Sequence, residues 1–228
     1  EVELLVDRLG KIYSLNNAIY IGTPAAISLR QSDRILMTSL ANKVVHVNEK
    51  GSNYSGRQEL LNSINRMIDG SIVEKENFDT VDLVYRSRNG KDIRLEDLAS
   101  GFKPLVYMLR LIENGWLTEN TLLEIDEPET NLHPQWVVEL AHLLVCINKT
   151  FGTKILITSH NPDMVSAIRY ISEKVGVLDT TRFYLAEQRE SSDMFDYKDL
   201  GSDIEPVFGS FNKSFDTLQK YVENYGEI

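Results

Sequence analysis

Two adjacent carboxylates, Asp126 and Glu127, have the type and spacing that could do chemistry. They follow a short apolar run at 121–125 that is typical of a buried strand, and Pro128 then ends the strand by removing a backbone donor. Acids at the carboxyl end of such a strand lie where open α/β sheets bind ligands. There, Asp126 can hold Mg²⁺ through water, and Glu127 can orient and deprotonate an attacking water. The alternative is a strand that ends in solvated acids.

Composition excludes several classes of protein. The chain has 228 residues, 42% of them hydrophobic and 25% charged, which is ordinary for a soluble globular protein with one core. A formal net charge of -10 argues against a broad nucleic-acid-binding face. The single cysteine, Cys146, excludes an internal disulfide and favours a reducing, cytoplasmic location. No apolar run is long enough to span a bilayer, so we expect no membrane association.

A near match to a phosphate-binding P-loop has Gly51 and Gly56 at the required spacing. The motif continues with Lys and Ser or Thr, whereas this chain has Arg57 and Gln58. Glutamine is a poor substitute for the hydroxyl that ligates Mg²⁺. We therefore interpret the segment as a polar loop before a helix with an apolar face at 60–68, and a working P-loop is the less favoured alternative.

Residues 80–98 are predicted to form a β-hairpin, because apolar and polar residues alternate on both sides of an Asn89-Gly90 turn. The hairpin is also the most basic stretch of the chain. We interpret it as a solvated strand face, and contact with an acidic partner or nucleic acid is the alternative. Its cations are Arg86, Arg88, Lys91 and Arg94.

A Ser100-Gly101 pair is expected at the N-terminus of a helix. Apolar residues at 105–112 repeat at helical spacing, Pro104 suits a first turn, and Gly115 suits the position after the last turn. A helix N-terminus offers free backbone N–H groups and a positive dipole end, which can receive a phosphate. In isolation, the pair would be an ordinary helix start.

A second buried strand is predicted at 154–158, with Ser159 and His160 at its carboxyl end. A helix at 134–149 joins it to the first strand, and Asn161-Pro162 begins the next helix. Strands that alternate with helices predict an α/β fold with a mostly parallel sheet, crossover helices and a small hairpin-containing accessory region. Further strands are expected at 17–22, 43–47, 175–178 and 183–185, and further helices at 33–40 and 215–222.

Three motifs in order carry a family resemblance: Leu98-Ala-Ser-Gly-Phe-Lys, residues 122–134, and Ile155-Leu-Ile-Thr-Ser-His. Together they resemble the ATP-binding-cassette-type ATPases, in the bacterial branch with an Asp-Glu-Pro-Glu-x-x-Leu-His-Pro signature. That branch is similar to the heads of chromosome-maintenance and recombination-repair ATPases, and to ATPases of anti-phage and overcoming-lysogenization-defect systems. The resemblance covers about residues 60–186 and implies the C-terminal part of a P-loop ATPase head.

The resemblance implies ATP and Mg²⁺ as cofactors, with roles at matching positions. Asp126 matches the Walker B aspartate that holds Mg²⁺, and Glu127 matches the catalytic base. His160 matches the switch histidine that contacts the γ-phosphate. The bottom-up argument agrees, because phosphoryl transfer needs a metal, an oriented water and donors around the γ-phosphate.

The resemblance also implies a head-to-tail homodimer that sandwiches ATP. Ser100 and Gly101 match the signature motif, which caps a nucleotide held mainly by the opposing subunit. Asn131 and His133 lie in the matching D-loop, which reaches across the dimer. The signature departs from the family at Phe102, where a second glycine is expected.

The family's P-loop lies well before the signature, and nothing in residues 1–50 matches it. Because the sequence also begins at Glu1 with its first methionine at Met37, we expect a piece of a longer protein with the P-loop upstream. A partner nuclease or DNA-associated protein is implied by family analogy, and a non-hydrolysing, nucleotide-gated scaffold is the alternative function. The expected divisions are an N-terminal remainder at 1–97, the ATPase core at 98–187 and a C-terminal tail at 188–228.

Overall fold

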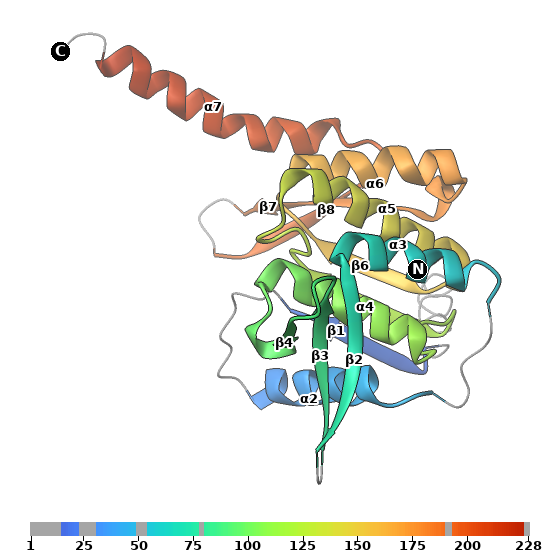
Figure 1. Ribbon diagram of the computed structural model, residues 1–228. Helices are drawn as coiled ribbons and strands as arrows, with labels where there is room; N and C mark the ends of the chain where they lie inside the picture. Colours follow the sequence, from blue (N-terminus) through green and yellow to red (C-terminus); the bar gives the residue numbers. More distant parts are fainter. Residues whose placement is uncertain (1–14, 23–30, 49–53, 78–79, 190–192, 226–228) are drawn as a thin grey trace. The chain divides into compact units, whose positions relative to one another are not determined.

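The computed structural model describes residues 15–22, 31–48, 54–77, 80–189 and 193–225 (Figure 1). Contacts divide the chain into two units, Glu1–Ser159 and His160–Ile228. The divisions expected from sequence at 97/98 and 187/188 stay predictions. Among the described residues, no helix combines the length and apolar character needed to cross a membrane.

The first unit contains a parallel sheet in the order β1-β5-β6. Its strands are β1 (Asn17–Ile21), β5 (Thr121–Asp126) and β6 (Lys154–Thr158). In the β5–β6 register Asp126 is opposite Thr158, so the acid and the hydroxyl meet at the carboxyl edge. The predicted α/β fold is confirmed, because each parallel neighbour is reached through intervening helices.

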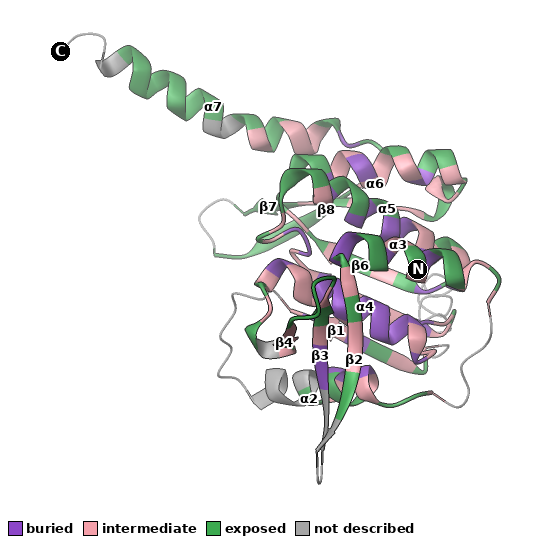
Figure 2. Cartoon of the chain, in the orientation of Figure 1, coloured by how far each residue is buried: buried purple, intermediate pink, exposed green. Residues whose placement is uncertain are grey.

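Helix α4 (Lys103–Glu113) provides much of the core of the first unit. It contacts α2 (Gln31–Val45) and α3 (Arg57–Ile68), and α3 in turn contacts α5 (Pro134–Phe151). Figure 2 shows α4 largely in the colour of buried residues. Pro104 lies in its first turn as predicted, and this helix leads directly out of the Ser100-Gly101 segment.

The strand predicted at 43–47 is wrong, because α2 continues through Val45. The side-chain amide of Asn114 donates hydrogen bonds to the carbonyls of Lys43 at 3.0 Å and Val44 at 2.8 Å. These bonds satisfy orphan carbonyls of the last helical turn. A tertiary contact from a residue 70 positions away thus overrides the local β preference of two adjacent valines.

An antiparallel accessory sheet in the order β2-β3-β4 also belongs to the first unit. Its strands are β2 (Gly70–Asn77), β3 (Thr80–Ser87) and β4 (Asp92–Arg94). The predicted hairpin is confirmed by β3 and β4, and the amide of Gly90 donates to the carbonyl of Ser87 at 2.9 Å. Strand β2 was not predicted, because its polar and apolar residues do not alternate.

The second unit contains a helix, an antiparallel pair of strands and a final helix. The elements are α6 (Pro162–Val175), η3 (Leu178–Thr180), β7 (Phe183–Gln188), β8 (Phe195–Gly201) and α7 (Glu205–Tyr225). The helix expected at 215–222 is confirmed within α7, and the strand expected at 183–185 lies within β7. Strand β8 was not predicted, because charged residues interrupt its apolar residues in the sequence.

The strand predicted at 175–178 is wrong. Val175 ends α6, and Gly176 has a φ of 78° as the capping residue. The amide of Val177 then donates to the carbonyl of Ser172 at 2.9 Å, which closes the helix end. The valines that suggested a strand instead belong to a helix terminus.

Candidate functional site

The carboxyl end of β5 is held by a hydroxyl from the neighbouring strand. The hydroxyl of Thr158 donates a hydrogen bond to Oδ1 of Asp126. The amide of Glu127 donates to the carbonyl of Thr158 at 3.0 Å and approaches its hydroxyl at 3.3 Å. Strand β6 therefore fixes both acids of the predicted metal and base pair.

Glu127 has a left-handed backbone, with a φ of 45°. A non-glycine residue there costs about 1–2 kcal/mol, and such strain persists only where neighbours hold it. The neighbours are Thr158, which accepts the amide of Glu127, and Thr130, whose hydroxyl donates to Oε2 of Glu127 at 3.1 Å. The candidate base is thus oriented from both its backbone and its carboxylate.

Two successive turns follow Glu127 and carry the predicted D-loop. The amide of Thr130 donates to the carbonyl of Glu127, and the amide of Leu132 donates to the carbonyl of Glu129, each at 3.0 Å. Asn131 is exposed and has a φ of 64°. Asn131 therefore lies at an exposed bend of this loop, and its D-loop role stays a prediction.

His133 is the N-cap of α5. Its Nδ1 accepts a hydrogen bond from the amide of Gln135 at 3.4 Å, and its side chain is exposed. The histidine thus has a structural role at a helix start, beside the D-loop role that its sequence position predicts.

The signature segment lies directly against the D-loop of the same chain. Ser100 and Gly101 belong to the short helix η2 (Ser100–Phe102), which leads into α4. Gly101 is buried, and a Cβ atom at this position would lie 2.6 Å from the carbonyl oxygen of Asn131. Only glycine permits this approach, so the structure brings together two segments that sequence reasoning treated separately.

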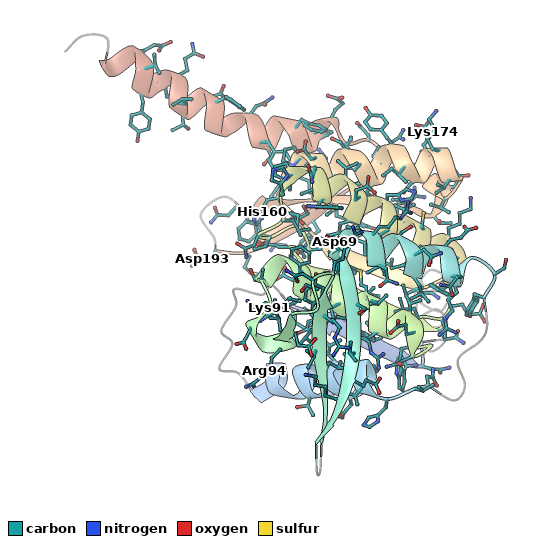
Figure 3. The ribbon with its side chains drawn as sticks, viewed as in Figure 1. Asp69, Lys91, Arg94, His160, Lys174 and Asp193 are labelled. Carbon is teal, nitrogen blue, oxygen red and sulfur yellow. The ribbon has the colours of Figure 1, made fainter. Side chains whose placement is uncertain are left out.

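His160 is the first residue of the second unit and lies two positions after the end of β6. Its side chain is exposed, and Figure 3 labels it. The next residue, Asn161, caps α6 as predicted, because its Oδ1 accepts from the amides of Asp163 at 2.8 Å and Met164 at 3.2 Å. The switch role of His160 stays a prediction.

Sequence reasoning missed the polar residues that form hydrogen bonds with the acidic loop, residues 126–133. Besides Thr130 and Thr158, they include Ser159, whose hydroxyl donates to Oε1 of Glu129 at 2.5 Å. A usable signal was present, since Thr158 ends the strand that pairs with β5 and a second hydroxyl residue, Ser159, follows it. Their contacts depend on the strand register, which the residue pattern alone does not give.

Within the near match to a P-loop, Gly51 lies outside the described residues. Gly56 has a φ of 91° and precedes α3. The guanidinium of Arg57 donates to the backbone carbonyl of Glu113 at 2.5 Å. The described part thus fits the interpretation as a polar loop before a helix.

Two arginines of the basic hairpin have acidic partners, one within the hairpin and one at the end of α3. Arg86 makes two hydrogen bonds to Asp92, at 2.7 and 2.9 Å, and Lys75 lies 2.7 Å from the same carboxylate. These bonds hold the pKa of Asp92 well below its usual range. Arg88 pairs with Asp69 at 2.6 Å (Figure 3 labels Asp69). The pairs favour the solvated-face interpretation over a nucleic-acid contact.

The donors at the end of β5 fit magnesium. Among the residues that the structure describes, no group of three or more His, Cys, Asp or Glu side chains is placed to hold a metal. Mg²⁺ does not need one, because it keeps several waters and binds through one or two carboxylates plus substrate phosphates. A single strand-end carboxylate such as Asp126 meets that requirement.

Comparison with known proteins agrees with this architecture. The model of the AAA ATPase domain family matches residues 16–165. The Septu protein PtuA of Bacillus thuringiensis is 33% identical over 101 residues, which cover 39% of this chain and 25% of that protein. An uncharacterized ABC transporter ATP-binding protein of Methanocaldococcus jannaschii is 33% identical over 114 residues, covering 48% and 19%.

A solved structure shares the fold. The Smc head domain with a coiled coil and joint from Pyrococcus yayanosii has a TM-score of 0.51 and 12% identity, over 81% of this chain and 31% of that one. The chain spans only a fifth to a quarter of the length of the two curated relatives. The family match extends from the start of the parallel sheet through the acidic loop and beyond β6. The chain therefore belongs to the AAA ATPase domain family.

Proposed function

We propose that the carboxyl end of β5 hydrolyses ATP, with Asp126 holding Mg²⁺ and Glu127 acting as the general base. The observation that carries this proposal is the restraint on the acid pair by Thr158. This residue forms hydrogen bonds with the side chain of Asp126 and with the backbone amide of Glu127. Catalysis of phosphoryl transfer is mostly positioning and charge stabilisation. A glutamate that is held at both its backbone amide and its carboxylate, beside an aspartate that holds the metal, supplies both.

The remaining predicted residues complete a composite site between two copies of the protein. His160 contacts the γ-phosphate, while Ser100 and Gly101 cap a nucleotide bound mainly by the other copy. Asn131 and His133 extend the D-loop across the dimer. The contact between Gly101 and the backbone of Asn131 supports this arrangement, because it joins the two segments that would face the partner.

We further propose that the protein acts in the cytoplasm, where the ATPase cycle would act on a partner nuclease or a DNA-associated protein. The partner class comes from the motif resemblance alone.

Steady-state phosphate release by the full-length protein, with and without Mg²⁺, tests the proposed reaction. Glu127→Gln removes the base while keeping the side-chain shape, and we expect the rate to fall by about 100-fold or more. Glu139→Gln is the matched control, because Glu139 is an exposed residue of α5. A Glu127→Gln protein that hydrolyses ATP at the normal rate would remove the assigned base.

A nucleotide-gated scaffold is the second candidate function. It is motivated by the lack of a P-loop match in the sequence, since the near match has Arg57 and Gln58 where the motif requires Lys and Ser or Thr. Tight ATP binding by the full-length protein without phosphate release would favour the scaffold. For the 228-residue chain alone, we expect no measurable affinity for ATP–Mg²⁺ by calorimetry, and micromolar binding would contradict that expectation.

A further inference from the structure

A buried hydrogen bond links the acidic loop, residues 126–133, to the residue that follows β6. Only 7% of Glu129 is exposed, and its Oε1 accepts a hydrogen bond from the hydroxyl of Ser159 at 2.5 Å. Its other oxygen, Oε2, is buried without a hydrogen-bond partner among the described residues. Burying carboxylate oxygens costs free energy unless they are hydrogen-bonded. A buried glutamate with one unpaired oxygen therefore calls for an explanation.

The backbone of Glu129 lies at the centre of the loop that carries the proposed chemistry. Its carbonyl accepts from the amide of Leu132 at 3.0 Å, which closes the turn that contains Asn131. Asn131 in turn packs its carbonyl against Gly101 of the signature segment. A hydrogen bond on the Glu129 side chain therefore restrains the turn on which the D-loop is built.

Thr158 and Ser159 are consecutive residues, and they bind different parts of the same loop. Thr158 contacts the side chain of Asp126 and the amide of Glu127, and Ser159 contacts the side chain of Glu129. Two adjacent hydroxyls thus hold three residues of the Asp-Glu-Pro-Glu sequence. Ser159 also precedes His160 in the chain, so the same bond restrains the peptide that leads into the predicted switch residue.

We propose that Glu129 and Ser159 are a positioning pair for ATP hydrolysis. Neither residue touches the nucleotide. Ser159 fixes the buried Glu129 carboxylate, and Glu129 fixes the loop that orients Glu127 and presents Asn131. The inference rests on the proposed function, and it assigns roles to two residues beyond the metal, base, signature and switch positions.

Kinetics of the full-length protein test the positioning role. Ser159→Ala removes the donor, and we expect kcat to fall roughly tenfold with KM for ATP unchanged, because a hydrogen bond to a charged acceptor is lost. Ser159→Thr restores a hydroxyl and should recover most of kcat. Ser166→Ala is the matched control, because it removes a hydroxyl that donates to the carbonyl of Pro162 at 2.7 Å within α6.

A double-variant cycle adds a second kinetic criterion. If Ser159 acts through Glu129, the effects of Glu129→Ala and Ser159→Ala on kcat should be clearly less than additive. Unchanged kcat in Ser159→Ala, a change confined to KM, or a loss that Ser159→Thr does not recover would each overturn the inference.

Hydrogen exchange without nucleotide separates this inference from the proposed function. In full-length Ser159→Ala we expect faster exchange at the amides of Thr130 and Leu132, which close the two turns of the loop, and no such change in Ser166→Ala. Exchange equal to that of the wild type would overturn the link between Ser159 and the loop. If the wild-type protein releases no phosphate, the proposed function fails, and the exchange result alone decides whether the pair holds the loop.

Discussion

The acidic loop at 126–133 and the basic hairpin of β3 and β4 are both polar regions of the first unit. They differ in the groups that bind their carboxylates. In the loop, hydroxyl groups donate to the carboxylates of Asp126, Glu127 and Glu129. In the hairpin, cations bind the carboxylate of Asp92. A hydroxyl orients a carboxylate and leaves its negative charge in place, whereas a guanidinium neutralises it.

The difference shows why a count of charges is a poor guide to function. The hairpin is the most basic stretch in the sequence, yet two of its arginines are paired with local acids. The acidic loop has fewer charged residues, but hydroxyl groups orient its three carboxylates.

The largest contrast is expected from isosteric neutralisation of one aspartate in each region. Asp126→Asn should lower Mg²⁺-dependent ATP hydrolysis by the full-length protein by about 100-fold or more, because the metal loses its carboxylate ligand. Asp92→Asn should change it by less than about twofold, since exposed ion pairs contribute little. Steady-state phosphate release measures both, and equal effects would break the comparison.

An intermediate effect, on the free energy of unfolding, is expected from two glycines. Gly101 packs against the acidic loop, and Gly90 lies in the turn of the hairpin. Gly101→Ala should destabilise the first unit by about 1–3 kcal/mol, because the new Cβ would lie 2.6 Å from the Asn131 carbonyl oxygen. Gly90→Asn should cost less, because nothing lies within 4 Å of that Cβ position and asparagine tolerates its φ of +78°. Urea unfolding followed by tryptophan fluorescence reports both changes, since both tryptophans, Trp116 and Trp136, belong to this unit. A Gly101→Ala protein as stable as the wild type would show that the two segments are loosely packed.

The smallest effect is expected from the pH dependence of the hairpin. Because Arg86 and Lys75 lower the pKa of Asp92 in the folded state, its stabilisation is complete above the unfolded pKa of about 4. The stabilisation is lost as the pH falls below that value through the folded pKa. Thermal unfolding of wild type and Asp92→Asn should therefore differ slightly near neutral pH and converge in acid or at high salt. A difference that grows in acid would contradict the assigned sign.

The sequence predicted those parts of the fold that local pattern specifies. The apolar runs at 17–22, 121–125 and 154–158 are short and bounded by turn residues, and all three are strands of the parallel sheet. The end of α2 could not be predicted, because it depends on Asn114 from a distant helix end. Strand β2 could not be predicted either, because its apolar and polar residues do not alternate. It forms a strand through its pairing with β3.

The candidate site likewise contains residues that the sequence indicated and contacts that only the fold shows. Asp126 and Glu127 are adjacent in sequence, so their position at a strand end indicated a metal and a base directly. The contact between Glu129 and Ser159 spans 30 positions and exists only in the observed β5–β6 register. The approach of Gly101 to Asn131 likewise needs the folded backbone. The residues proposed for chemistry were named from type and spacing, and their roles stay predictions, whereas the residues that contact them could be found only in the folded chain.

Mixing two inactive full-length variants tests most directly whether the acids of one copy act on a nucleotide capped by another. Glu127→Gln removes the base, and Ser100→Arg blocks the signature segment, so each variant alone should hydrolyse ATP slowly. In an equal mixture, half of the dimers contain one copy of each variant, and each such dimer has one complete site. We predict recovery of roughly a quarter of the wild-type rate, whereas a mixture as inactive as its components would contradict the composite site.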